Sequence, residues 1–500
     1  MELFTAKIAP SLHKTENTVP DSADTKTLTT PPRILGLDGL RAIAMIFVVF
    51  YHVFPQKVSA GFIGVDVFFV ISGFLITALL LREKCVKGKV DIFPFWMRRI
   101  RRIMPVVILT TLTAGALAVL ISIFGPLSSK DATTGLRWQI FGALTGTYNW
   151  FEIAHSSSYF DSANPLLLTN LWSLAVELQF YIIWPLVLML LTRITASTKI
   201  HLTFTLAAAA SAAIWHQILL VQDSANATRA YVGTDAHIFG MMIGASLALA
   251  IPNIMTHPQK PAARYWGWIS FSALISLTIL AILAQDSAWF YPWGMVLAAI
   301  FSALTIRGIL PDNQHGPGAL LGKTLETKPC KWLGVRSYGI YLWHWPLWVI
   351  GYYIFEIDRT FLALVVILFS VFFAHLSYKY VEEPIRRGTF TPWMKNIFGK
   401  RTKVTAAVSA FSFAAAALTA YGIFTSSDLT SAQQIVTAGE KICRRKHSRK
   451  HQRKTKQIKT KQIRAEPLRK QNPRKHKNIL NRKNLNQQHR QSASLELSRK

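Results

Sequence analysis

Long apolar runs dominate this sequence and restrict what it can fold into. Several stretches approach the roughly 20 apolar residues that a helix needs to cross a bilayer core, for example 34–54, 62–81 and 105–124. Hydrophobic residues make up 51% of the chain, although its formal net charge is +31. A soluble protein of this length is rarely so apolar. We therefore predict an all-α fold, a polytopic membrane helix bundle.

The distribution of basic residues predicts how the bundle is oriented. We expect about ten spans and a less apolar eleventh, near residues 34–54, 62–81, 105–124, 170–191, 203–221, 237–251, 265–284, 289–306, 337–355, 360–378 and 404–424. With a cytoplasmic N-terminus, the inner segments, including the N-terminal arm, hold 28 Lys and Arg, whereas the outer loops hold 5. The positive-inside rule favours this orientation.

The remaining segments are polar or external. Residues 1–32 are predicted to be a disordered cytoplasmic arm, 33–390 the membrane domain, 391–424 a linker with the eleventh span, and 425–500 a basic tail. From residue 441 the tail holds 22 Lys and Arg against 2 acidic residues, and it lacks the apolar content of a core. Its predicted outer location disfavours nucleic acid; binding to an anionic surface and a functionless remnant both stay open.

Charged side chains inside spans are costly, so each is a candidate functional residue. Arg41 and His52 lie 11 residues apart in the first span, on one helix face and separated by about 16 Å along the axis. Histidine suits a general base because its pKa lies near working pH. The alternatives are an i,i+3 ion pair of Arg41 with Asp38 and a merely interfacial His52.

Two carboxylates fall near the depth of His52. Asp66, in the second span, is predicted to orient the imidazole, and Glu177 lies in the outer half of the fourth span among aromatic residues. A structural ion pair is the alternative for Glu177. Gly61, Gly64 and Gly73 are expected to allow close helix packing rather than chemistry.

A cluster of arginines precedes the third span on the inner side. Arg98, Arg99, Arg101 and Arg102 occupy four of five positions, more than topology alone requires. Guanidinium groups bind phosphate well, so a phosphate-bearing donor such as a coenzyme A thioester fits this face. The three widely spaced cysteines do not form a metal motif, and no metal is expected.

Six segments in order resemble the membrane acyltransferase family 3, which includes the O-antigen and peptidoglycan O-acetylases. These segments are 37–52, 61–74, 98–102, 172–181, 338–346 and 380–387. The resemblance implies transfer of an acyl group, usually acetyl from acetyl-CoA, to hydroxyls of an extracytoplasmic glycan or glycolipid. The expected location is then the cytoplasmic membrane of a bacterium, in contact with membrane lipids.

The resemblance also implies roles for individual residues, of which Arg41, His52 and the arginines match most directly. The expected catalytic residues are His52, Asp66 and Glu177. The expected donor-binding residues are Arg41, Arg98, Arg99, Arg102 and His344. The expected substrate contacts are Trp172, Ser173, Tyr338 and Tyr341.

Many relatives carry an SGNH-type hydrolase-like domain after an eleventh span, and we expect this chain to lack one. No Gly-Asp-Ser or Asp-x-x-His motif occurs in 425–500. The chain then acts alone, needs a separate SGNH-type partner, or is truncated. Direct transfer is favoured over an acyl-enzyme on Tyr338, Tyr341 or Ser173. The rival class is a transporter or flippase, for which inverted repeats are expected in many folds.

Overall fold

The computed structural model describes residues 33–155, 164–222, 227–251, 264–284, 290–313, 316–355, 358–388, 402–439 and Thr455. Within these ranges all regular elements are helices, which confirms the predicted all-α class. Residues 33–428 belong to one compact unit and 429–439 to a second, short helical one. The predicted N-terminal arm and most of the basic tail lie outside the described residues.

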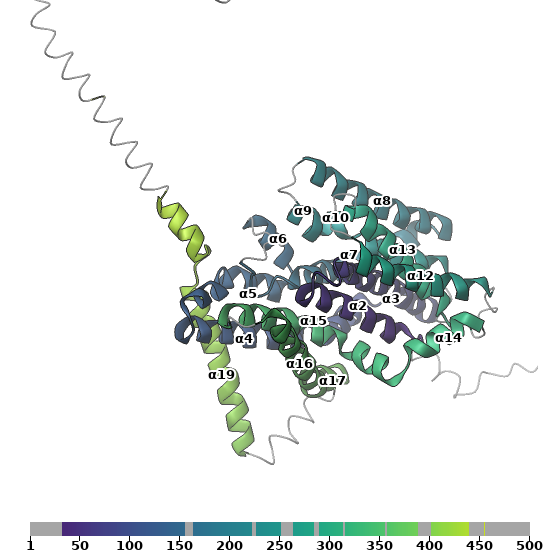
Figure 1. Ribbon diagram of the computed structural model, residues 1–500. Helices are drawn as coiled ribbons and strands as arrows, with labels where there is room; N and C mark the ends of the chain where they lie inside the picture. The colour runs from purple at the N-terminus through teal and green to yellow at the C-terminus, as the bar shows by residue number, and fades with distance from the viewer. Residues whose placement is uncertain are drawn as a thin grey trace, which may run out of the picture. The chain divides into compact units, whose positions relative to one another are not determined.

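Every predicted span coincides with a helix (Figure 1). The helices at the predicted spans are α2 (Leu37–Val53), α3 (Gly64–Lys87), α4 (Ile92–Phe124), α7 (Leu171–Ile194), α8 (Thr198–Gln222), α11 (Phe239–Ala250), α12 (Tyr265–Leu283), α13 (Met295–Gly308), α15 (Lys328–Ile354), α16 (Arg359–Ser377) and α19 (Thr402–Thr425). This agreement arises because a continuous apolar run satisfies its backbone in lipid only as a helix.

The number of spans is less well determined than their helical nature. Among the described residues, seven helical segments are long and apolar enough to cross a membrane. α2, with 17 residues, falls just short of that length, and α15 begins with charged residues. The protein is therefore a multi-pass membrane protein, and eleven spans remain a prediction.

Short helices lie between α4 and α7. α5 (Leu136–Thr145) and α6 (Tyr148–Ala154) form there, with Trp138 and Tyr148 buried and Trp150 partly exposed. The other short helices are α9 (Ala227–Val232), α10 (Thr234–His237), α14 (Gly316–Leu325) and α17 (Glu383–Arg386). The side chains of Trp138 and Tyr148 thus belong to the internal packing.

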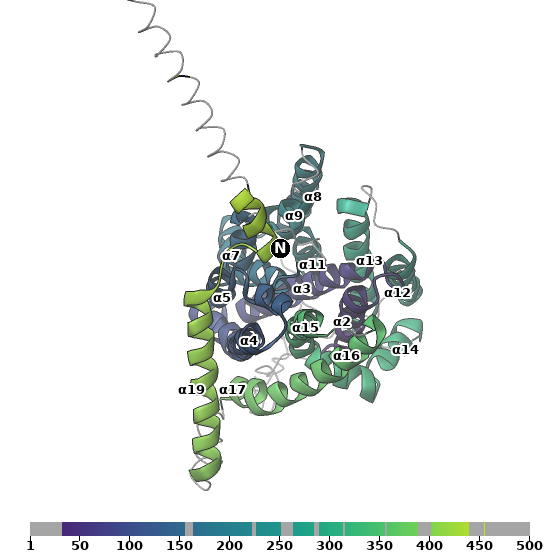
Figure 2. The same cartoon turned by 60° about the vertical axis from the view of Figure 1, so that its left-hand side comes forward.

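Glycines bring the central helices into backbone contact. A Cβ at Gly73 of α3 would lie 2.0 Å from the carbonyl oxygen of Met241 in α11, so only glycine fits this crossing. A Cβ at Gly334 of α15 would similarly lie 1.7 Å from the carbonyl oxygen of Asp38 in α2. The packing role predicted for Gly73 is confirmed. These close approaches hold α2, α3, α11 and α15 together, as Figure 2 shows from a second side.

Candidate functional site

Five helices surround a cavity of about 330 Å³. Its walls come from α2, α3, α4, α7 and α15, with further residues from the segment 378–386. The charged residues of the wall are Arg33, Asp38, Arg41, Arg99, Arg102, Glu177, Lys331, Glu382 and Arg386. Basic residues outnumber acidic ones six to three, so the cavity favours an anionic ligand.

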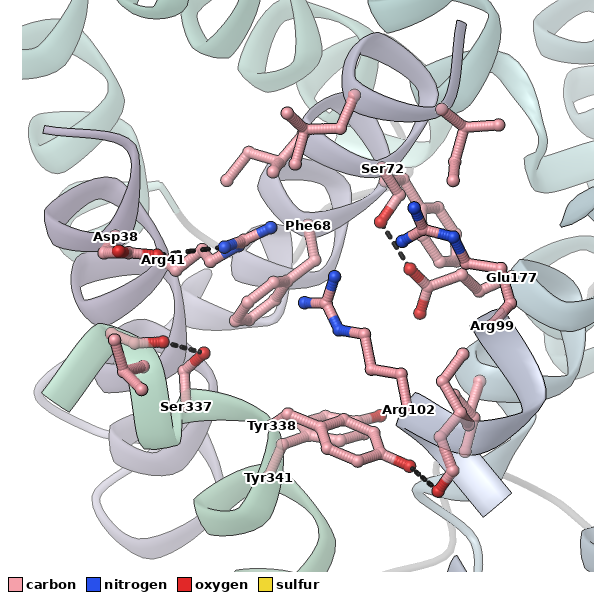
Figure 3. A pocket seen from close by; sticks show the side chains of 18 of the residues that line it. Asp38, Arg41, Phe68, Ser72, Arg99, Arg102, Glu177, Ser337, Tyr338 and Tyr341 are labelled. Atoms are coloured by element: carbon pink, nitrogen blue, oxygen red, sulfur yellow. Dashed lines mark hydrogen bonds and ion pairs between the residues drawn. The ribbon is translucent and has the colours of Figure 1, made fainter. Parts of the chain in front are cut away.

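Three of the predicted donor-binding arginines meet in this cavity (Figure 3). Arg99 and Arg102 lie three residues apart on α4, so one helix face presents both. Arg41 reaches the cavity from α2, and its Nη1 donates to Oδ1 of Asp38 at 3.0 Å. The ion pair of Arg41 with Asp38 therefore exists and holds the guanidinium at the cavity, and donor binding by Arg41 stays a prediction.

Arg98 does not join this group. It is absent from the cavity wall, and its Nη2 lies 3.3 Å from Oε2 of Glu83. Its side chain is 53% exposed. Arg98 lies one turn before Arg102, nearer the start of α4, where Glu83 of α3 pairs with it.

Glu177 lies at the cavity beside two hydroxyl groups that the sequence analysis did not single out. Ser72 of α3 and Tyr181, one turn further along α7, both donate to Oε1 of Glu177. The guanidinium of Arg99 packs against the Tyr181 ring at 6.0 Å. Glu177 thus accepts from neutral donors rather than forming the predicted alternative, an ion pair with a neighbouring helix. Tyr181 follows Glu177 by four residues, so helical spacing alone predicts that the two side chains are neighbours.

Three predicted substrate contacts line the cavity. The hydroxyl of Tyr341 donates to the carbonyl oxygen of Asn170 at 2.5 Å, and Oγ of Ser173 lies 2.7 Å from the same hydroxyl. Tyr338 donates to the carbonyl oxygen of Ile103 at 2.9 Å. Because the Tyr341 hydroxyl donates its proton to Asn170, it accepts a hydrogen bond from the Ser173 hydroxyl. Both hydroxyls of this pair are therefore engaged as donors.

His52 pairs with His344 of α15. Nδ1 of His52 lies 3.1 Å from Nε2 of His344, and the two rings stack with centroids 5.2 Å apart. Nδ1 of His344 lies 2.7 Å from the carbonyl oxygen of Tyr341, to which it must donate. Neutral His344 then presents an acceptor at Nε2, so His52 donates from Nδ1. The lone pair of His52 is left on Nε2, which has no hydrogen-bond partner within the described part of the chain.

This pairing differs from two expectations. His344 is not part of the cavity wall, so the structure places it beside His52 rather than at the predicted donor site. The predicted contact of Asp66 with His52 is not made, because Oδ1 of Asp66 lies 3.0 Å from Nε2 of His237. α3 presents Asp66 to His237 of α10, and Gly64, two residues earlier, packs beside Ala44 and Val48 of α2, one to two turns before His52.

Trp172 belongs to the surroundings of that buried Asp66–His237 pair. Its ring stacks on His237 with centroids 5.3 Å apart and meets Tyr231 at 4.7 Å. It does not line the cavity. A substrate contact for Trp172 therefore stays a prediction without geometric support, whereas its packing around His237 is evident.

The site combines an anion-binding cavity with a histidine pair. Arg41 and His52 share one helix, as do Lys331 and His344, so both helices run from the cationic end of the cavity towards the histidines. In the described ranges no group of three or more His, Cys, Asp or Glu is arranged to hold a metal ion. The arrangement can bind phosphates at one end and remove a proton at the other.

These features define a helical membrane protein with a cavity lined mainly by cations and a neighbouring histidine pair. The model of the acyltransferase domain family matches residues 34–378. The chain belongs to this family of acyltransferases, as the six motifs predicted. No solved structure matches the chain.

Curated relatives carry related names. "Peptidoglycan O-acetyltransferase OatA" of Listeria monocytogenes is 33% identical over 373 residues, which cover 73% of this chain and 58% of the relative. "Putative peptidoglycan O-acetyltransferase YrhL" of Bacillus subtilis is 34% identical over 378 residues, covering 74% of this chain and 57% of the relative. The chain thus spans less than three fifths of the length of these relatives.

Proposed function

We propose that this protein transfers an acetyl group from acetyl-CoA on the cytoplasmic side to a hydroxyl of an extracytoplasmic glycan. The observation that carries the proposal is the cavity in which Arg41, Arg99 and Arg102 converge, with the His52–His344 pair beyond it. The names of the relatives make peptidoglycan the first acceptor to test. A glycolipid is the second.

The distribution of charge supports the sidedness of this reaction. The predicted inner segments hold 28 of the Lys and Arg outside the tail, against 5 in the outer loops, as expected for a cytoplasmic N-terminus. The arginine end of the cavity then faces the cytoplasm, where acetyl-CoA is made. His52, later in the outward-running α2, is nearer the acceptor side.

In this mechanism the arginines bind the diphosphate of the donor. Guanidinium groups recognise phosphate through paired, charge-assisted hydrogen bonds. The pantetheine arm follows the wall of the cavity past Phe68 and Phe69 towards Ser173 and Tyr341. Arg41 and His52 lie about 16 Å apart along α2, a distance that an extended pantetheine arm covers. The thioester carbonyl is thereby delivered towards the histidine pair.

His52 is the general base of the proposed reaction. The acceptor hydroxyl transfers its proton to Nε2 of His52 while its oxygen attacks the thioester carbonyl carbon. The carbon–sulfur bond then breaks, and the thiolate takes the proton from the imidazolium to leave as the free thiol. His344 holds the tautomer that this step requires, since its Nε2 accepts from Nδ1 of His52.

The hydroxyl geometry favours direct transfer over a covalent intermediate. A nucleophilic hydroxyl must donate its proton to a base, but Tyr341 donates to a backbone carbonyl and Ser173 donates to Tyr341. Tyr338 likewise donates to a backbone carbonyl. None of the three is presented to His52 or His344 by these contacts.

The function is tested with purified protein, radiolabelled acetyl-CoA and defined peptidoglycan fragments. Label should enter the glycan with the wild type, and His52→Ala should lower the rate by about 10²–10⁴-fold, the usual contribution of a positioned base. The matched control is His155→Ala, because His155 is exposed and lies in the segment between α6 and α7. Unchanged transfer by His52→Ala, or transport of a precursor without acetyl transfer, would refute the proposal.

A further inference from the structure

The edge of the cavity carries two cations that the proposed reaction has not yet used. Arg33 precedes α2 and Lys331 lies in the first turns of α15, and both line the cavity. Their side chains are 46% and 44% exposed. They therefore stand at the opening, whereas Arg41, with 18% side-chain exposure, lies deeper.

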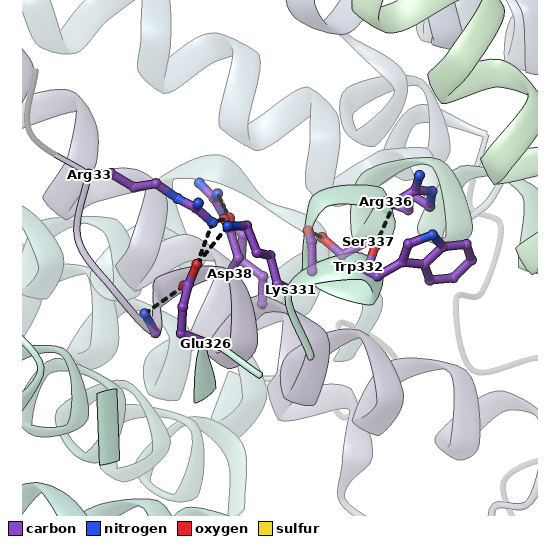
Figure 4. Close-up of polar contacts among 10 residues, drawn as sticks. Arg33, Asp38, Glu326, Lys331, Trp332, Arg336 and Ser337 are labelled. Carbon is purple, nitrogen blue, oxygen red and sulfur yellow. Dashed lines mark hydrogen bonds and ion pairs between the residues drawn. The ribbon is translucent and has the colours of Figure 1, made fainter. Parts of the chain in front are cut away.

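One carboxylate holds the two cations together (Figure 4). Oε1 of Glu326 lies 3.0 Å from Nη2 of Arg33 and 3.0 Å from Nζ of Lys331, while Oε2 accepts from the backbone N–H of Gly36 at 3.1 Å. Nη2 of Arg33 also contacts Oδ2 of Asp38 at 2.7 Å. These contacts fix the positions of both cationic groups.

Donor groups remain available after these contacts. Arg33 uses only Nη2, so its Nε and Nη1 have no partner in the described part of the chain. Lys331 has one ion pair for three N–H donors. The cluster with Arg41 contains three cations and two carboxylates, so a net positive charge persists at the opening.

The size of the cavity places a second part of the donor at this opening. A volume of about 330 Å³ is at the lower end of pockets for drug-sized ligands, and a whole acyl coenzyme A is larger than that. If the pantetheine arm and diphosphate fill the cavity, the nucleoside end lies outside its mouth. That end carries a phosphate monoester on the ribose, a group that binds paired cations well.

We propose that Arg33 and Lys331 form a second phosphate subsite, which binds the ribose phosphate of the coenzyme A donor. This inference rests on the proposed function and extends it to the choice of donor. The two cations are supplied by segments 298 positions apart in sequence, which Glu326 joins. The subsite makes the protein selective for coenzyme A over nucleotides without that phosphate.

Equilibrium binding tests the subsite without relying on turnover. Full-length protein in nanodiscs of zwitterionic lipid is titrated with coenzyme A and with 3′-dephospho-coenzyme A. We expect the wild type to bind coenzyme A about tenfold more tightly or better, as for loss of a charge-assisted contact. Arg33→Gln and Lys331→Gln should each reduce this preference to below about threefold.

The control separates a phosphate contact from general electrostatics. Lys328 is exposed on the same helix and does not line the cavity, so Lys328→Gln should retain the preference. Equal affinity of the wild type for both ligands would overturn the proposal. So would variants that lose affinity for both ligands alike, because that result indicates a purely structural link between α2 and α15.

Lipid phosphate is the other source of the same chemistry. Suppose that Arg33→Gln and Lys331→Gln change the affinity for coenzyme A only in nanodiscs of anionic lipid, and that the wild type binds coenzyme A and 3′-dephospho-coenzyme A equally well. The subsite then binds lipid headgroups and the proposal is wrong. Acetyl transfer is measured in parallel. A protein that prefers coenzyme A but transfers nothing would contradict the proposed function while leaving the subsite intact.

Discussion

The contact between His52 and His344 leads to a quantitative prediction. His344 is fully buried, and its Nε2 accepts from Nδ1 of His52 at 3.1 Å. His344→Ala leaves that donor unpaired and frees the His52 ring to adopt the other tautomer. Loss of a buried hydrogen-bond partner costs about 1–3 kcal/mol, which corresponds to a decrease in kcat of roughly 5–150-fold if the cost appears in the transition state.

Two conservative variants distinguish a role of His344 in positioning His52 from a role in filling space. In His344→Gln the side-chain Oε1 can occupy the place of Nε2, so kcat should recover to within about tenfold of the wild type. In His344→Asn the amide is one methylene too short to reach His52, and activity should resemble that of the alanine variant. The assay is the initial rate of acetyl transfer at saturating donor, recorded from pH 5 to 9. Wild-type kcat in His344→Ala, or equal impairment of Gln and Ala variants, would refute the positioning role.

Three further predictions concern the arginines, the helix packing and a buried carboxyl. Arg102→Gln should raise the donor KM by roughly tenfold or more in transfer assays, while Arg98→Gln, outside the cavity, should change it less than about threefold; equal effects would contradict the assignment. Gly73→Leu should lower the thermal stability in detergent by about 1–3 kcal/mol or abolish folding, because any Cβ clashes with Met241; a stable variant would refute this crossing. Burial raises the pKa of Glu152 in α6 well above its usual range, so native stability falls as pH rises above about 4.3. Glu152→Gln should remove that part of the pH dependence in unfolding scans at pH 5 and pH 8, and an unchanged slope would contradict it.

The helices were predictable because their determinants are local. A long apolar run forces helical hydrogen bonding whatever its neighbours, so each predicted span coincides with a helix. Arg41, Arg99 and Arg102 were predicted together at the donor end, and these side chains do meet in one cavity. Glu177 was predicted near the depth of His52, but it lies with these arginines.

Partners across helices were harder to predict because they depend on helix rotation. Asp66 was predicted beside His52, but α3 presents it to His237, whereas His344 comes to His52 from α15. The same limit applies to Arg33, Lys331 and Glu326, whose contacts join segments distant in sequence. Ser72 beside Glu177 is a further example, since nothing in the spacing of the two residues reveals their contact.

Transfer of the acetyl group across the membrane is tested in sided proteoliposomes. Vesicles are selected with the face of the N-terminus outward, peptidoglycan fragments are enclosed, and radiolabelled acetyl-CoA is added outside. We expect acetylated glycan inside intact vesicles with the wild type, none with His52→Ala, and no coenzyme A in the lumen. Label that reaches the glycan only when donor and acceptor share one side would contradict it.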